Sequence, residues 1–245
     1  MSSPSSATTD GITLPASARC SASVSCCGCG CCHARGEAVL ILAAAFIGFW
    51  TLSSLLASYY VYDYAGVTRW NWLPEALSFP PRRWLNIHAG LDESTATLTR
   101  FFPESTSMIL DIYDAREMTE PSIARARELH PTAQPAAAGK LDALPIADGS
   151  CDTLFLLFTA HEIRHPARRR EFFAEAARVL ASSGQLLLVE HLRDWKNFVA
   201  FGPGFLHFYP REEWLRVAHW AGLKVIREAG ATPLVRYFLM TKAPA

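Results

Sequence analysis

Polar and titratable side chains follow five apolar segments of this sequence, each at the segment's C-terminal end. Carboxylates there can accept hydrogen bonds from ribose hydroxyls, and histidines can move a proton near neutral pH. Ligands of open α/β sheets bind at the carboxyl ends of the strands, so we expect one ligand-binding rim. Its members in chain order are His88, Ala89, Gly90, Leu91, Asp92, Asp111, Asp114, Asp142, Ala143, Thr159, Ala160, His161, Glu162, Glu190 and His191.

Strands and helices that alternate along the chain must position this rim. Two further apolar segments close the chain, and helix signals such as Pro121, Pro166 and Pro210 separate the earlier ones. This order predicts a doubly wound α/β fold with a largely parallel, seven-stranded sheet. The expected strands are residues 84–88, 108–113, 141–144, 152–159, 185–190, 224–228 and 235–241, and the expected helices are 92–102, 119–130, 166–181 and 210–220.

The turn after the first strand limits the class of ligand. Gly90 permits close backbone approach, but the sequence has neither G-x-G-x-x-G nor a lysine-bearing phosphate loop. Asp92 and Glu93 would repel a pyrophosphate, which argues against ATP, NAD and an NAD-linked reductase. A carboxylate such as Asp114, about 28 residues after Asn86, suits the ribose of a cationic nucleoside. The pattern is compatible with S-adenosylmethionine (SAM).

A longer stretch resembles a known family. Residues 141–191 read LDALPIADGSCDTLFLLFTAHEIRHPARRREFFAEAARVLASSGQLLLVEH. They are similar to the second half of class I SAM-dependent methyltransferases of the type 11 kind. The shared motifs are Asp142-Ala143 before Leu144-Pro145, the DGSCD of 148–152, the RVL of 178–180 and the LLVE of 187–190. The resemblance extends over residues 84–242 and implies a Rossmann-like methyltransferase fold with SAM as cofactor.

The first-strand motif departs from the family pattern of an acidic residue followed by G-x-G-x-G. Asn86 stands at the acidic position, and His88-Ala89-Gly90-Leu91-Asp92 retains one of the three glycines. The methionine part of SAM packs against this turn in the family. His88 therefore either contacts the adenosyl ligand or fills its pocket. Two hypotheses follow: an active methyltransferase, and a catalytically inactive methyltransferase-like binding domain.

The resemblance also implies roles for single residues. His161 is the expected general base for an acceptor that must lose a proton, with Glu162 as a second catalytic candidate. The alternatives are that His161 only bonds a backbone carbonyl and that Glu162 pairs with Arg164 or Arg168. Asp142 is expected to accept the adenine amine, and we expect no metal. The expected cofactor contacts are Asn86, His88, Gly90, Asp111, Asp114, Asp142, Ala143 and Thr159.

An uncharged segment precedes this domain. Residues 38–62 carry no charged side chain and exceed the roughly 20 residues that cross a bilayer. Trp50 and Tyr59 are typical of membrane interfaces. Residues 37–62 therefore predict a single-pass membrane anchor, with a small excess of arginine after it favouring a cytoplasmic domain. The alternative is an apolar helix packed on the domain; the run is too long for a typical secretory signal.

The remaining segments complete the interpretation. Residues 1–36 hold six of the seven cysteines and are predicted to be a disordered tail. Three alternatives remain for its cysteines: they bind zinc or copper, they carry acyl chains, or they have no function. Residues 63–83 form a connector, and the stretch 60–72 loosely resembles the substrate cap of quinone-methylating members. Residues 197–210 are a possible apolar flap or sheet packing, and the basic run 168–170 is a solvated face or a lipid contact.

The amino-acid composition narrows the class of molecule that the protein can bind. The formal net charge is zero, which excludes a generally basic nucleic-acid binder. With the apolar anchor, the resemblance implies a membrane-tethered SAM-dependent methyltransferase acting on a lipophilic small molecule that is quinone-, isoprenoid- or lipid-like. Nothing in the sequence predicts the oligomeric state.

Overall fold

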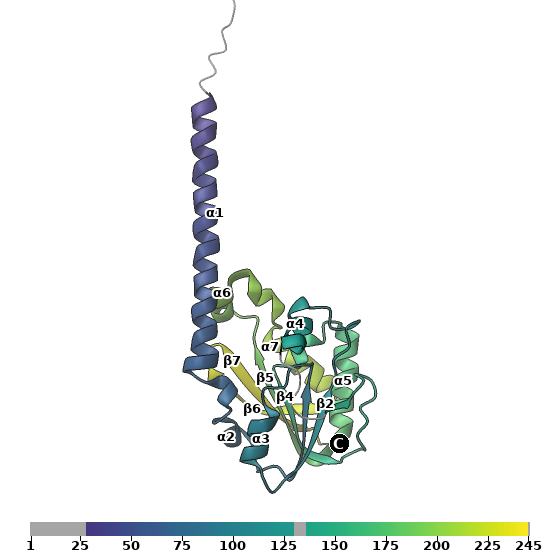
Figure 1. The fold of residues 1–245 in the computed structure, drawn as a ribbon. Helices are drawn as coiled ribbons and strands as arrows, with labels where there is room; N and C mark the ends of the chain where they lie inside the picture. The colour runs from purple at the N-terminus through teal and green to yellow at the C-terminus, as the bar shows by residue number, and fades with distance from the viewer. Residues whose placement is uncertain (1–27, 130–135, 245) are drawn as a thin grey trace, which may run out of the picture. The chain divides into compact units, whose positions relative to one another are not determined.

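Seven strands form one sheet in the order β3-β2-β1-β4-β5-β7-β6 in the computed structural model, which describes residues 28–129 and 136–244 (Figure 1). β7 runs antiparallel to β5 and β6, and the other neighbours are parallel. The predicted doubly wound, largely parallel sheet is confirmed. The strands are β1 (Arg83–His88), β2 (Thr106–Asp111), β3 (Ala137–Ala138), β4 (Cys151–Leu157), β5 (Leu180–His191), β6 (Leu223–Thr232) and β7 (Val235–Lys242).

Helices precede and connect these strands. Three of the predicted helices begin within one residue of their proline signals, because proline has a fixed φ and needs no hydrogen-bond partner in a first turn. The α-helices are α1 (Gly28–Ser58), α2 (Leu73–Ala76), α3 (Thr95–Phe101), α4 (Pro121–Leu129), α5 (Pro166–Val179), α6 (Trp195–Phe201) and α7 (Arg211–Trp220). The shorter turns are η1 (Tyr59–Tyr64), η2 (Val67–Arg69), η3 (Ala160–Glu162) and η4 (Gly202–His207).

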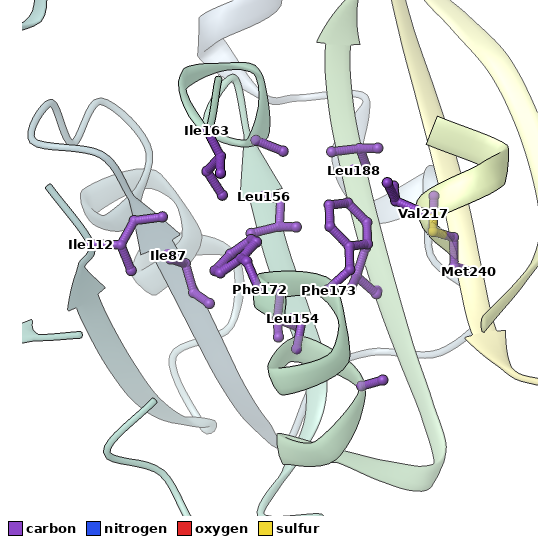
Figure 2. Close-up of a cluster of buried hydrophobic side chains, with 14 of the residues drawn as sticks. Ile87, Ile112, Leu154, Leu156, Ile163, Phe172, Phe173, Leu188, Val217 and Met240 are labelled. Atoms are coloured by element: carbon purple, nitrogen blue, oxygen red, sulfur yellow. The ribbon is translucent and has the colours of Figure 1, made fainter. Parts of the chain in front are cut away.

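The sheet buries apolar side chains on both faces. On β4, Leu154 and Leu156 belong to one core cluster, whereas the alternate residues Phe155 and Leu157 belong to the other. This alternation follows from the two-residue repeat of a strand. Figure 2 shows the first cluster, where Phe172 and Phe173 of α5 lie close to Leu154 and Leu156. An uninterrupted apolar run is therefore the expected sequence of this central strand.

The connector supplies the layer on the second face. Val61, Val67, Trp70 and Leu73 are fully or almost fully buried in the second core cluster, together with Leu187 of β5. The connector predicted at residues 63–83 is therefore part of the core as well as a cover for the ligand edge.

Several elements differ from the predicted bounds, and three of the differences have a clear physical reason. The third strand is Ala137–Ala138 rather than 141–144, because the backbone N–H of Gly139 donates to the carbonyl of Asp111 at 2.9 Å and holds this segment against β2. α3 begins at Thr95 rather than 92, because the Asp92 carboxylate accepts from the backbone of Ser94 and Thr95. β5 begins at Leu180, which is paired with Cys151, so α5 ends before the predicted 181.

The chain divides into two units, Met1–Ala45 and Phe46–Ala245. Within the first, α1 begins at Gly28, before the predicted start at 37, and the side chains of residues 35–45 are exposed. Of the disordered tail predicted for residues 1–36, residues 28–36 are helical in α1, so the prediction is wrong there. Residues 1–27, with Cys20, Cys26 and Cys27, lie outside the described residues, as do the side chains of Cys29, Cys31 and Cys32.

Candidate active site

A cavity of about 400 Å³ lies at the C-terminal ends of β1 and β4. β1 pairs with β2 on one side and with β4 on the other, so the order of strands reverses here and a crevice is expected. Its walls come from the end of β1 and the following loop, from the connector, from α4, and from β4 and η3. The lining includes Tyr62, Trp70, Asn86, His88, Leu91, Glu93, Ile123, Leu157, Phe158, His161 and Glu162.

Backbone strain is concentrated in this wall. Trp70 and Phe158 have φ values of 58° and 54°, and they are the two non-glycine residues with positive φ in the described part of the chain. Their rings lie 5.9 Å apart. Such a conformation costs about 1–3 kcal/mol per residue and persists only where the surrounding structure imposes it, which is common at ligand sites.

Asn86 holds the loop that follows β1. Its side chain is buried, and Nδ2 donates to Ser94 Oγ at 2.9 Å and to Thr95 Oγ1 at 2.8 Å. A carboxylate in its place could accept but not donate. The departure from the acidic family residue thus stabilises the start of α3, while Asn86 still lines the cavity.

His88 forms part of the cavity wall. Its Nδ1 accepts from the backbone N–H of Gly90 at 3.2 Å, and burial lowers its pKa below the usual value. The imidazole is therefore neutral at pH 7, with its hydrogen on Nε2. Of the two sequence-based alternatives, the structure has His88 beside an open cavity rather than filling it.

Arg127 covers the glycine turn. Gly90 has a φ of 95°, and a Cβ there would lie 2.6–2.9 Å from atoms of the Arg127 side chain. Arg127 Nη1 donates to Asp111 Oδ2 at 2.5 Å, and its guanidinium lies 4.3 Å from the centre of the Tyr113 ring. The space left by the glycine is occupied by this side chain, and the carboxylate at the end of β2 is already paired.

Four other predicted cofactor residues do not line the cavity. Asp114 accepts from the backbone of Arg116, which lowers the Asp114 pKa, and a hydrogen bond from Arg168 likewise lowers the pKa of Asp142. Thr159 is buried and donates to the carbonyl of Ile87 at 3.0 Å, and Ala143 is exposed. The predicted single open rim is therefore wrong in geometry, because arginine side chains extend across the edge of the sheet; the cofactor roles stay predictions.

His161 lies between two carboxylates. Its Nδ1 is 2.7 Å from Glu190 Oε2 and its Nε2 is 3.1 Å from Glu162 Oε1. Burial alone would lower the His161 pKa, but the charges and hydrogen bonds of Glu190 and Glu162 outweigh it and raise the pKa to about 10. The ring is consequently an imidazolium at neutral pH. It bonds carboxylates rather than a backbone carbonyl, and it is not free to accept a proton.

Glu162 offers the free acceptor atom. Its Oε2 is buried and has no hydrogen-bond partner among the described residues, and the residue lines the cavity. Burial raises its pKa, but the hydrogen bond and charge of His161 outweigh this and lower the pKa below the usual range. Glu162 pairs with His161 rather than with Arg164 or Arg168. A carboxylate oxygen with unused lone pairs therefore lies at the cavity.

The same cluster has spacing that a metal ion could use. Ligand atoms of His161, Glu162 and His207 all lie within 4.8 Å of one another. Arg164 Nη2 lies 2.9 Å from His207 Nδ1, so this nitrogen accepts and the His207 hydrogen is on Nε2. Only two ligand atoms then remain beside a guanidinium cation. The geometry favours proton handling over metal binding.

The sequence interpretation missed the aromatic walls. The hydroxyl of Tyr62 lies 3.1 Å from Nε2 of His191, whose Nδ1 is 2.9 Å from the carbonyl of Leu234. Burial lowers the pKa of His191 to about 4, so His191 is a neutral residue that fixes the Tyr62 wall. The density of aromatic residues in 59–72 was the available signal.

The basic run at 168–170 is a solvated face only in part, because Arg170 is exposed and Arg168 partly exposed, whereas Arg169 is buried. Arg169 is 2% exposed and donates to Glu213 and to the carbonyl of Ile163. Arg168 bonds Asp142 and Glu171, and the Arg170 guanidinium lies 3.3 Å from the centre of the Trp220 ring. These arginines hold α5 in place.

Comparison with known proteins finds a family model that matches part of the chain. Residues 100–188 match the model described as a methyltransferase domain, Methyltransf_11. This part of the chain is therefore similar to SAM-dependent methyltransferase domains. SAM is the cofactor of such domains. No protein with a curated description matches the sequence.

Solved structures show the same fold. The mitomycin 7-O-methyltransferase MmcR is 19% identical, with a TM-score of 0.54 over 73% of this chain and 55% of its own. The pyocyanin biosynthetic protein PhzM is 17% identical, with a TM-score of 0.53 over 72% of this chain and 55% of its own. The PH0226 protein of Pyrococcus horikoshii OT3 is 14% identical, with a TM-score of 0.52 over 69% and 85%. The chain spans about half the length of the first two.

The residues of the methyltransferase domain fit SAM in two parts. Glu93, Glu162 and the aromatic rings of Tyr62, Trp70 and Phe158 give the cavity a lining suited to a sulfonium cation. The ribose and adenine would be held by Asp111 and Asp142, which now hold Arg127 and Arg168. Both arginine side chains are partly exposed, so each has room to turn outward into solvent, which would free the carboxylates.

Proposed function

We propose that the chain is a membrane-anchored methyltransferase that methylates a hydroxyl group of a lipophilic small molecule. The observation that carries this is the unpartnered Glu162 Oε2 beside a cavity with aromatic walls, at the switch point of a methyltransferase fold. A structural neighbour, the mitomycin 7-O-methyltransferase, is by its name an O-methyltransferase.

Binding and orientation account for most of the rate enhancement that the site has to supply. SAM provides an activated methyl group, so the protein must bring acceptor and donor together in line. Asn86 fixes the loop after β1, and the carboxylates of Glu93 and Glu162 attract the cationic centre. Asp111 would hold the ribose hydroxyls, and Asp142 with Ala143 the adenine, once Arg127 and Arg168 move aside.

Glu162 handles the proton. Its Oε2 would accept the hydroxyl hydrogen as the hydroxyl oxygen receives the methyl group of SAM, whose carbon–sulfur bond breaks to leave a neutral thioether. The methylated acceptor is then neutral and Glu162 is protonated. His161 orients Glu162 through the 3.1 Å contact and is itself fixed by Glu190. In this assignment the carboxylate is the base and the histidine a positioning residue, the reverse of the order that the sequence favoured.

The anchor has support from the described residues. One helix, with its span at Arg35–Arg69, is long and apolar enough to cross a membrane by length and composition, with a mean hydropathy of 2.2. In its most apolar 18-residue window no side chain is buried, which suits a lipid environment. We place the methyltransferase domain on the cytoplasmic side, from the arginine excess after the span.

Two measurements test the proposal on the full chain in detergent. Calorimetry with SAM should show binding, and no heat at millimolar SAM contradicts the enzyme assignment. With a prenylated hydroquinone as acceptor, Glu162→Gln should lower kcat about 10²–10⁴-fold. It should also weaken SAM binding, because one of the two carboxylates that attract the cationic centre is lost. The exposed Glu171→Gln on α5 is the control and should leave kcat as it is. Equal loss in both variants, or none in Glu162→Gln, removes Glu162 from the mechanism.

A second candidate is a catalytically inactive binding domain. The observation in its favour is the Arg127–Asp111 pair over the glycine turn, at the place where the family binds its cofactor. In that case SAM would bind only after Arg127 is removed.

A further inference from the structure

The segment formed by α6 and η4 exposes large apolar side chains. Trp195 is 71% exposed and Leu206 57% exposed, and Phe198 and Val199 are exposed between them. We call these four residues the α6–η4 surface. Soluble proteins rarely leave such neighbours in water unless something covers them.

This surface is continuous with the end of α1. The Trp50 ring lies 5.6 Å from the Phe198 ring, and Ser53 Oγ donates to the carbonyl of Val199 at 3.0 Å. Gly202 packs directly against Trp50 and leaves no room for a Cβ. The attachment is therefore specific.

The side of these α1 turns that points away from α6 is also apolar. Partial burial recurs at Trp50, Ser53, Ser54, Ala57 and Ser58, at helical spacing, and Trp50 and Ser53 of this stripe contact α6. Leu52, Leu55 and Leu56 point away from it and are exposed. The stripe toward the domain is small and polar apart from Trp50, whereas the free side carries leucines. We therefore expect one apolar environment to cover both the exposed leucines of α1 and the α6–η4 surface.

We propose that the α6–η4 surface inserts into the interfacial layer of the bilayer that holds α1. This rests on the membrane anchor of the proposed function. α6 contacts Trp50 and Ser53, which lie about 8–12 Å along the helix axis before the end of α1. This depth is comparable to that of helices buried at the boundary of headgroups and acyl chains. Trp195 suits that layer, and the exposed Lys196 beside it suits anionic phosphates.

The insertion brings the bilayer close to the cavity. η4 ends at His207, whose ring lies 5.2 Å from that of His161. A lipophilic acceptor dissolved in the membrane thus reaches the site beside η4 without crossing water.

Tryptophan quenching of the full chain in phosphatidylcholine–phosphatidylglycerol vesicles tests the insertion. The Trp195 signal is the difference between the native chain and Trp195→Phe. We expect at least a twofold loss of this signal with lipids brominated near the headgroup end of the acyl chain, and little loss with aqueous iodide. Trp220, which is 48% exposed on α7, gives the matched control through Trp220→Phe, with the opposite response.

The outcomes separate the claims. If the chain does not float with vesicles, the anchor itself is wrong. If it floats and Trp195 responds to iodide but not to brominated lipid, the anchor stands and the insertion is overturned. If neither quencher acts and Trp195→Cys cross-links between chains, the surface is a dimer contact, which also overturns it. SAM calorimetry is independent of all three results.

Discussion

Arg127 is the residue that decides how the nucleoside half of the site works. It lies over Gly90 and pairs with Asp111, so the two features that the sequence assigns to cofactor binding are joined by a side chain from α4. The sequence predicted that Gly90 and Asp111 lie at this edge. It could not predict Arg127, because the contact joins residues separated along the chain and depends on the packing of α4.

Replacing Arg127 by alanine should tighten SAM binding several-fold. The change frees the Asp111 carboxylate, and a hydrogen bond to a charged group contributes about 1.5–3 kcal/mol. Calorimetry of the two proteins measures the ratio of Kd values, with the exposed Arg125→Ala on the same helix as control. Weaker binding would show instead that the guanidinium itself contacts the ligand. Binding in the variant alone would favour the inactive domain.

At the scale of elements, α6 and η4 show where sequence patterns stop being informative. Residues 197–210 were predicted either to form an apolar flap or to pack on the sheet. Neither the hydrophobic periodicity nor the composition of this segment indicates what covers its apolar side chains. The regular strands were predictable, because β4 and β5 are continuous apolar runs buried on two faces. The connector was harder, since its contribution to the second core cluster comes from scattered residues such as Val67 and Trp70.

Gly202→Ala should detach α6 from α1. Gly202 has a φ of 55°, and an added Cβ would collide with the Trp50 ring. We expect the free energy of unfolding to fall by about 1–3 kcal/mol, from backbone strain and displacement of the indole. Urea titration in detergent measures it. Gly204→Ala is the control, because a Cβ there meets only ordinary contacts. A loss of equal size in both would contradict the Trp50 contact.

At the scale of the whole molecule, buried histidines set the pH range of stability. His191 has a folded pKa of about 4, below the ordinary 6.5, so between these values only the unfolded chain binds its proton. His161 behaves in the opposite way: its folded pKa of about 10 adds stability that is complete below pH 6.5 and lost as pH rises toward 10. Stability should therefore be greatest near pH 6.5.

Urea unfolding between pH 4.5 and 9.5 checks this. A shift of the His191 size corresponds to roughly 3 kcal/mol over the full acid limb. His191→Gln should flatten the acid limb, and His161→Gln should flatten the alkaline limb. A profile that rises steadily from pH 4.5 to 9.5 would contradict both assignments.

The connector makes the anchor and the domain difficult to separate. Val61 is fully buried in the second core cluster, and Tyr62 and Trp70 form walls of the cavity. A protease that cut after residue 62 to release a water-soluble form would leave one face of the sheet partly uncovered and the ligand chamber open on one side. Shedding the membrane attachment in this way would inactivate the protein.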